Sequence, residues 1–291
     1  MRTLLFLLIS FILCAQNIEF NFRIIYLEQD MTDVAFKIAA FSNDLQKQLN
    51  AYEWDLPHTD FDEIETNINV NIDKNISEED FTGMITVSSG PKTKKTMFVP
   101  LRKNIYFTEQ NISFKIDYEK EPDIDRKDPS YLETIVLFYA NLAMGENFDR
   151  LSYTDRSNFN LYGDHYYKEV YSFENLITRA SDRNEWKKRI ELINNYRMGK
   201  NIELRRLNAL IYNAIYFINT GKSDRAAYFV EPIREKIENI SELPDNFFDN
   251  NFFYIAEIFR QNKDKYLDFL IEQDPERESF YENKLGKKIK K

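Results

Sequence analysis

The chain has 291 residues, of which 43% are hydrophobic and 15% aromatic, so a packed core is expected rather than disorder. The net charge of −9 argues against nucleic acid or an anionic lipid surface as the main partner. With only 7 glycines, the chain offers few tight loops of the kind that cradle phosphates.

Residues 1–15 are typical of a secretory signal peptide. Arg2 precedes an apolar run at residues 4–13, which is too short to span a bilayer as a helix. We favour cleavage after Ala15, which would leave Gln16 as the N-terminus and remove the only cysteine, and with it thiol catalysis and cysteine-based metal sites. Lipidation of Cys14 is the alternative, although the bulky Leu13 precedes it where a small residue is usual. The mature chain is expected outside the cytoplasm.

Residues 16–122 are predicted to form an α+β sheet domain. Alternating apolar and polar residues predict strands at 18–26, 66–72, 81–87 and 112–118, with a shorter strand at 96–101. A turn is predicted at residues 88–91, and Thr32 or Asp30 is available to cap one amphipathic helix. The apolar residues of that helix are Val34, Ile38, Phe41, Leu45 and Leu49. Short connections favour a mostly antiparallel sheet with the helix packed on one face.

An acidic linker at 119–128 precedes a predicted all-helical domain at residues 129–282. The first helix is expected to end near Gly145, and its apolar stripe is Leu132, Ile135, Val136, Tyr139, Leu142 and Ala143. Further helices are predicted at 166–180, 185–198, 203–220, 223–237, 247–261 and 263–272, with Gly221 and Ser223 as caps. Short loops predict an irregular antiparallel bundle, followed by a solvated basic tail at 283–291.

One hairpin of this bundle resembles a tetratricopeptide unit. Ala214, Phe217, Gly221 and Ala226 occupy the small, aromatic, turn and small positions of that 34-residue pattern. No second or third copy follows at a fixed spacing, and solenoids need about three repeats for stability. The sequence therefore predicts at most one such unit.

The residues that usually carry chemistry are sparse. His58 is interpreted as a surface-loop residue and His165 as the start of a helix, because no zinc-binding spacing joins them. Residues 123–128 superficially suggest a calcium loop, but the sixth position is Asp128 rather than the required glycine. No catalytic, cofactor-binding or metal-binding residue is assigned, and the chain is predicted not to be an enzyme. A hydrolase would need convergent carboxylates in a cleft, which sequence cannot show.

Aromatic residues concentrate at 162–173 and 247–254. Most are expected to be core residues, and the rest could mark a protein-contact surface, since such residues are enriched at interface centres. A second hypothesis is a periplasmic module that binds a ligand such as a glycan, with Tyr166, Tyr167 and Tyr171 as stacking platforms.

The order of features resembles, in a divergent form, the PorD family of the type IX secretion system, a periplasmic family formerly described as a domain of unknown function. The resemblance covers the opening strand, residues 49–54, 66–72 and 81–87, and is strongest at 130–145 and 148–152. Only Gly163 stands where the family usually has paired glycines, and residues 182–186 replace an aromatic and basic segment.

This resemblance implies a non-enzymatic accessory or assembly component of the type IX translocon. It implies a periplasmic protein that associates with the outer membrane through partners, with no transmembrane segment in the mature chain. The implied partners are outer-membrane translocon subunits, including a tetratricopeptide-bearing lipoprotein, and no cofactor is expected. The glycan-binding module remains the alternative.

Overall fold

The computed structural model describes residues 18–26, 32–54, 64–91, 105–151, 162–177, 186–197, 199–240, 243, 247–260 and 263–286. Several sequence predictions lie outside these ranges. They are the signal peptide, the capping role of Asp30, the loop position of His58, the strand at 96–101 and the tail beyond residue 286.

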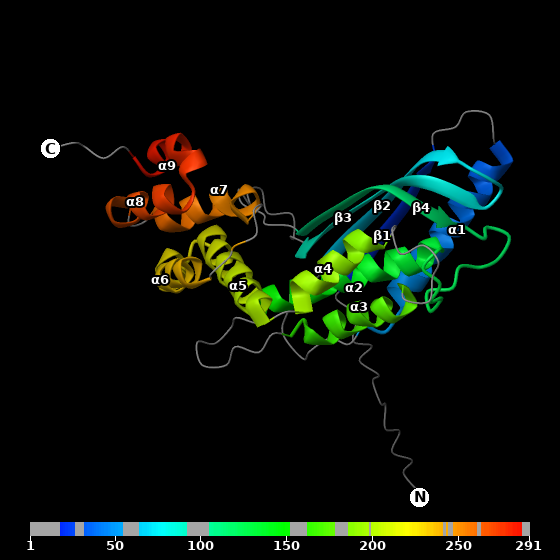
Figure 1. The fold of residues 1–291 in the computed structure, drawn as a ribbon, viewed down its shortest axis with the longest axis horizontal. Helices are drawn as coiled ribbons and strands as arrows, with labels where there is room; N and C mark the ends of the chain where they lie inside the picture. The colour runs from blue at the N-terminus through cyan, green and yellow to red at the C-terminus, as the bar shows by residue number, and fades with distance from the viewer. Residues whose placement is uncertain are drawn as a thin grey trace, which may run out of the picture.

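The N-terminal part is a four-stranded mixed sheet in the order β1-β2-β3-β4, which confirms the α+β class (Figure 1). The strands are β1 Ile18–Tyr26, β2 Ile64–Asn75, β3 Asp80–Pro91 and β4 Ile105–Lys115. β1 and β2 are parallel, because helix α1 (Thr32–Ala51) connects them, and the other two pairings are antiparallel. The predicted mostly antiparallel sheet is therefore correct.

Helix α1 lies against β1 with the apolar residues that the sequence predicts. Ile38, Phe41, Leu45 and Leu49 are buried, and Val34 is half-buried. A second row, Ser42, Gln46 and Asn50, lies one helical turn apart and reaches the edge of β1. Their oxygens accept hydrogen bonds at 2.8–3.2 Å from the backbone N–H groups of alternate strand residues, namely Ile24, Phe22 and Phe20. Polar side chains of α1 thus occupy a strand edge that would otherwise be open to pairing.

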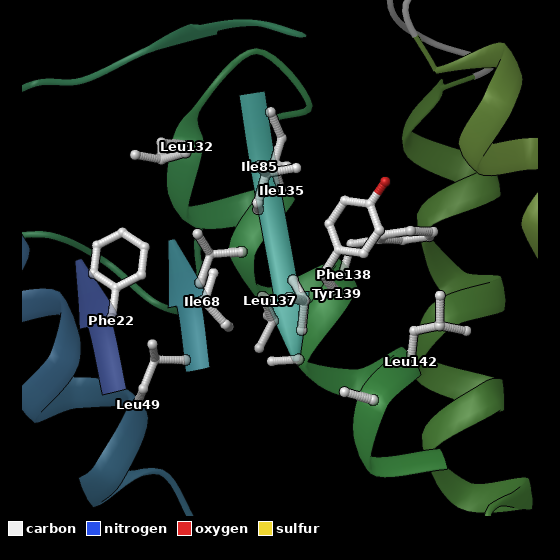
Figure 2. Packing of buried hydrophobic residues seen from close by; sticks show 14 of the residues in the cluster. Phe22, Leu49, Ile68, Ile85, Leu132, Ile135, Leu137, Phe138, Tyr139 and Leu142 are labelled. Carbon is white, nitrogen blue, oxygen red and sulfur yellow. The ribbon is translucent and has the colours of Figure 1, made fainter. Parts of the chain in front are cut away.

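The buried face of the sheet is covered by two helices, whereas the sequence predicted one. Helix α2 (Leu132–Leu151) shares the core of α1 and the strands. In Figure 2 the side chains of Phe22, Ile68 and Leu49 lie alongside Leu137 and Ile135 of α2. Every residue of α2 from 132 to 145 is buried, so α2 lies inside the molecule rather than on its surface.

The predicted turn at residues 88–91 is wrong, because β3 continues to Pro91. Ser88 pairs with Asn67 of β2, and Ser89 pairs with Thr66. Ser89 is buried, and its hydroxyl lies 2.6 Å from both the Thr66 hydroxyl and the Asn147 amide. Hydrogen-bonding partners on β2 and α2 satisfy the serine hydroxyl inside the sheet, so tertiary contacts override the local turn preference.

The predicted strand at 112–118 is also placed incorrectly, because β4 starts at Ile105 and ends at Lys115. The pairing of β3 with β4 shifts between Gly83 and Ile85, opposite Asn111, which has a φ of +57°. This bulge interrupts the apolar alternation, so only the half of β4 after the bulge is readable from the sequence.

The predicted helix end at Gly145 is wrong as well, since α2 runs on to Leu151. A Cβ atom at Gly145 would lie 2.8 Å from Cζ of Tyr167. The glycine therefore lets the Tyr167 ring of the neighbouring helix approach closely, and it does not stop α2.

The remaining helices follow the predicted positions within a few residues. They are α3 Asp164–Ile177, α4 Lys187–Arg197, α5 Gly199–Asn219, α6 Ser223–Asn239, α7 Phe247–Phe259 and α8 Lys263–Gln273. The sequence missed the 3₁₀ turn Pro275–Arg277 and helix α9 (Glu278–Leu285), so the predicted tail from residue 283 begins inside a helix.

The predicted hairpin is formed by α5 and α6, and Gly221 closes α5 as expected. Gly221 has a φ of +72°, and the Lys222 N–H donates to the Phe217 carbonyl at 2.8 Å, the pattern of a Schellman C-cap. Ala214 and Ala226 are buried. Ser223 does not cap α6, because it is the first helical residue and the N-cap position is Lys222.

Buried apolar residues form two clusters. The first includes the sheet, α1, α2 and α3 and extends to Trp186, and the second runs from Leu207 to Leu285. In Figure 1, α5 extends from the sheet-bearing part toward α6, α7, α8 and α9 at the other end. The apolar core is therefore continuous across the acidic segment at 119–128. The expected domain division there stays a prediction.

Candidate functional site

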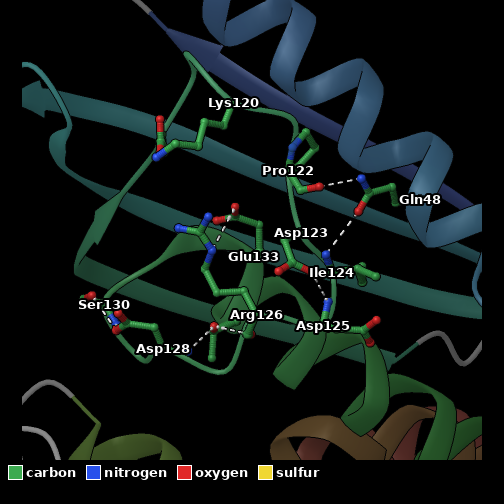
Figure 3. A network of polar contacts seen from close by, with 12 residues as sticks. Gln48, Lys120, Pro122, Asp123, Ile124, Asp125, Arg126, Asp128, Ser130 and Glu133 are labelled. Carbon is green, nitrogen blue, oxygen red and sulfur yellow. Dashed lines mark hydrogen bonds and ion pairs between the residues drawn. The ribbon is translucent and has the colours of Figure 1, made fainter.

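The acidic segment at 119–128 is held against α1 and α2 (Figure 3). The Ile124 N–H donates to Oε1 of Gln48 at 3.1 Å, and Oγ1 of Thr134 donates to the Arg126 carbonyl at 2.7 Å. Asp123 accepts the Asp125 N–H at 3.0 Å, so its side chain serves the local turn. No group of three or more histidine, cysteine or acidic side chains within the described ranges could hold a metal ion.

Glu133, beside this segment, is the least satisfied buried acid of the described residues. Its side chain is 0% exposed, and neither carboxylate oxygen has a hydrogen-bond partner. The closest cation is Arg126, whose Nε lies 3.8 Å from Oε1. Burial raises the pKa of the Glu133 carboxyl, and nearby backbone N–H groups and the Arg126 charge only partly oppose that shift.

Glu133→Gln is expected to stabilise the protein at pH 8 by about 1–2 kcal/mol, because it removes a buried charge whose closest cation is 3.8 Å away. With the pKa raised, the folded state keeps the proton to higher pH than the unfolded chain does. Stability contributed by this group is therefore lost as pH rises from the ordinary carboxyl range through the raised pKa. Urea denaturation from pH 4 to pH 8 should show the gain only above that window.

The matched control for this prediction is Glu276→Gln, which changes an exposed carboxylate. We expect its free energy of unfolding to match the wild type at every pH. An equal gain in both variants, or a Glu133→Gln variant that is less stable at pH 8, would contradict the role of burial.

A buried ion pair joins β4 to α4. Nε of Arg189 donates to Oε2 of Glu109 at 2.8 Å, and the Tyr139 hydroxyl of α2 donates to the same oxygen at 2.7 Å. The Arg189 guanidinium also lies 4.3 Å from the ring centroid of Trp186. Burial, and next the Glu109 charge, raises the pKa of Tyr139, so the phenol stays protonated as a donor.

A second buried network joins α2, α3 and α5. Arg205 donates to Asp149 through Nε at 2.5 Å and Nη2 at 2.9 Å, and also to Asp164 at 2.7 Å. The Gly163 N–H donates to Oδ1 of Asp149 at 3.0 Å. A Cβ at Gly163 would lie 2.6 Å from that oxygen, so a glycine is required at this position. Burial raises the pKa of Asp149, while the Arg205 guanidinium opposes the shift.

Both networks satisfy their charged groups internally, which suits a structural role. Arg189 is bound to one carboxylate and Arg205 to two, and each guanidinium lies beside an aromatic ring, Trp186 in the first network and Tyr167 in the second. Neither was predicted from the sequence. Their partners are 80 and 56 residues apart, so no local spacing signals them.

The residues that the sequence analysis named as candidates differ in burial. His165 is exposed at the start of α3, as predicted. Tyr166 and Tyr167 are buried and cannot serve as glycan-stacking platforms, while Tyr171 is half-buried. The reason is that α3 packs this face on α2, where the Tyr166 ring stacks on Phe148 with centroids 5.0 Å apart.

The aromatic residues at 247–254 are mainly packed within the second core. Phe252 makes an edge contact with Phe280 at 4.8 Å between centroids, and Phe253 remains 37% exposed beneath Lys284. Other exposed aromatic residues lie on the α5–α6 hairpin, where Tyr216 is 41% and Tyr228 is 60% exposed. The sequence pattern of the hairpin predicts its packed positions, and neither tyrosine is among them. That pattern could therefore have identified both tyrosines as exposed.

A cavity of about 200 Å³ lies between α5 and α6. Its lining residues are Glu203, Pro232, Glu235, Lys236, Asn239 and Ile240. Lys236 forms an ion pair with Glu203 at this place, and the volume is below the range of about 300–1,000 Å³ usual for ligand sites. The exposed tyrosines of the hairpin are therefore a better candidate for function than this cavity.

None of the helices in the described part combines the length and the apolar character needed to cross a membrane. Comparison with known proteins finds no matching family model, no matching curated protein and no matching solved structure.

Proposed function

We propose that this protein is a non-enzymatic accessory or assembly component of the type IX translocon, acting in the periplasm by protein–protein binding. The observation that carries the proposal is the PorD-like order of segments. Residues 18–26 form β1, residues 66–72 and 81–87 lie in β2 and β3, and residues 130–145 lead into and form most of α2. The resembling segments therefore lie in strands and a helix that contribute to the first apolar core.

The α5–α6 hairpin is the docking surface that we assign to this function. Tyr216 and Tyr228 are exposed on it, and tyrosine is enriched among residues that dominate binding energy at protein interfaces. The buried Arg205 network fixes α5 to α2 and α3, so the hairpin is presented on a rigid support. The proposed partners are outer-membrane translocon subunits, including a tetratricopeptide-bearing lipoprotein.

The test is an affinity pull-down of C-terminally tagged protein from gently solubilised envelopes, with mass spectrometry of the captured proteins. The wild type should recover the outer-membrane translocon and its lipoproteins. Tyr216→Ser/Tyr228→Ser should lose them, whereas Phe36→Ser, which alters a 77% exposed aromatic on α1, should retain them. Deletion of the gene should also reduce export of type IX cargo. Unchanged export in the deletion strain would overturn the proposal.

A further inference from the structure

The outward face of the sheet carries a grid of mainly polar side chains that lie in register across the strands. The buried face is covered by α1 and α2, and in Figure 1 α2, α3 and α4 all lie below the sheet. On the opposite face, one row across the four strands contains Asn21, Asn67, Ser88 and Tyr106 in register. The next row contains Arg23, Asn69, Thr86 and Thr108. In the row after that, the apolar residues Ile25 and Met84 lie on either side of Asn71.

Three amides on the central strand β2 are the centre of this grid. Asn67, Asn69 and Asn71 alternate with buried residues and are half-buried on the outward face. Among the described residues, no hydrogen-bond partner is found for their side chains, whereas Asn21 nearby donates to Glu65 at 3.0 Å. Each free amide offers two donor hydrogens and an acceptor oxygen.

Asparagine is an unfavourable choice for these positions on stability grounds. It is depleted in strands, where β-branched residues such as threonine pack better on a pleated surface. Three asparagines at alternate positions of a central strand therefore lower the local stability of the sheet. Residues that are unfavourable for the local structure are expected at functional sites. The grid is thus a candidate binding surface.

The chemistry of the grid favours a neutral ligand rich in hydroxyl groups. The side chains of β2 and β3 at its centre are neutral, while Arg23 of β1 lies directly beside Asn69, and Glu19 and Glu65 form the row before Asn67. Protein interfaces, by contrast, have an apolar and aromatic centre. Here the exposed aromatic, Tyr106 at 71%, lies at the β4 side of the Asn67 row, where it can stack on a sugar ring.

We propose that the outward face of β1–β4 binds a neutral oligosaccharide through Asn67, Asn69 and Asn71, with Tyr106 as a stacking residue. The three amides span roughly 13 Å along β2, at about 3.3 Å of rise per residue. An extended oligosaccharide lying along the strand would place successive hydroxyl groups at successive amides. This surface is separate from the α5–α6 hairpin, so it does not depend on the proposed secretion role.

The experiment titrates the full mature chain with chitotetraose, maltotetraose and cellotetraose, and with tetragalacturonic acid as an anionic comparison. Calorimetry gives the affinity, and the side-chain amide signals of ¹⁵N-labelled protein report which asparagines are contacted. The test variant is Asn67→Thr/Asn69→Thr/Asn71→Thr, which should fold because threonine favours strands. The matched control is Asn43→Thr, which removes an exposed amide from α1.

At least one neutral tetrasaccharide should bind the wild type and shift asparagine amide signals. The triple variant should bind it at least about tenfold more weakly, because the amide–hydroxyl pairs are lost, while Asn43→Thr should bind it unchanged. The proposal is overturned if no neutral tetrasaccharide binds, if only the anionic sugar binds, or if the triple variant binds as the wild type does. It is also overturned if the triple variant loses a captured envelope protein while no sugar binds, which would make the face a protein-docking surface.

Discussion

Replacing Arg189 with methionine is expected to lower the free energy of unfolding by about 3–5 kcal/mol. The Glu109 carboxylate, 7% exposed, would be left inside the protein without its cation. The Tyr139 hydroxyl would still donate to it, but one neutral hydrogen bond does not replace a buried charge partner. Urea denaturation at pH 7, followed by far-ultraviolet circular dichroism, measures the loss.

Two further variants separate the charge effect from a packing effect. Arg189→Met/Glu109→Leu/Tyr139→Phe removes every polar member of the network, and should recover most of the stability, since apolar replacement of a buried pair is often neutral. Arg260→Met changes a 57% exposed arginine paired with Glu257 at 3.3 Å and should cost less than about 1 kcal/mol. If Arg189→Met costs no more than Arg260→Met, the network does not stabilise the fold.

Local periodicity was sufficient to predict the elements that have one buried face. The alternation at Phe20 and Phe22 located β1, and the spacing of Phe41 and Leu45 located α1, because one side of each element faces the core. Gly221 was predictable for a related reason, since its positive φ closes α5 within a few residues of chain. In these cases the determining contacts follow directly from sequence spacing.

Elements determined by distant contacts were not predictable. Gly145 signals a helix end by itself, and only the Tyr167 ring, 22 positions further along the chain, explains why a glycine stands inside a helix that continues. Ser89 signals a turn until Thr66 and Asn147 are placed beside its hydroxyl. Side-chain partners of this kind depend on how the elements pack, which spacing along one segment does not report.

The two candidate surfaces were only partly predictable from the sequence. The outward position of Asn67, Asn69 and Asn71 follows from the alternation of β2 and was visible in the sequence. Their alignment with Ser88 and Tyr106 depends on the register across three strands, which only the structure provides. Exposure of Tyr228 on α6 likewise depends on how the hairpin packs.

Phe138→Ala is expected to lower the free energy of unfolding by about 3–5 kcal/mol, close to the largest cost of a core truncation. The predicted apolar stripe of α2 leaves Phe138 at its margin, which would make the residue partly exposed and the substitution mild. The structure instead has Phe138 fully buried, with edge contacts to Tyr139, Phe173 and Trp186 at 5.1–5.7 Å between ring centroids. Its removal would leave a cavity where α2, α3 and the start of α4 meet.

The matched control is Phe36→Ala, the same truncation at a 77% exposed position of helix α1. It should change the free energy of unfolding by less than about 0.5 kcal/mol, because no core contact is lost. Phe138→Leu should cost less than Phe138→Ala, since leucine refills part of the cavity. Similar losses at positions 138 and 36 would mean that Phe138 makes no stabilising core contact. A large difference would show that the side of α2 outside its predicted apolar stripe is also packed in the core, where Phe138 meets Phe173 and Trp186.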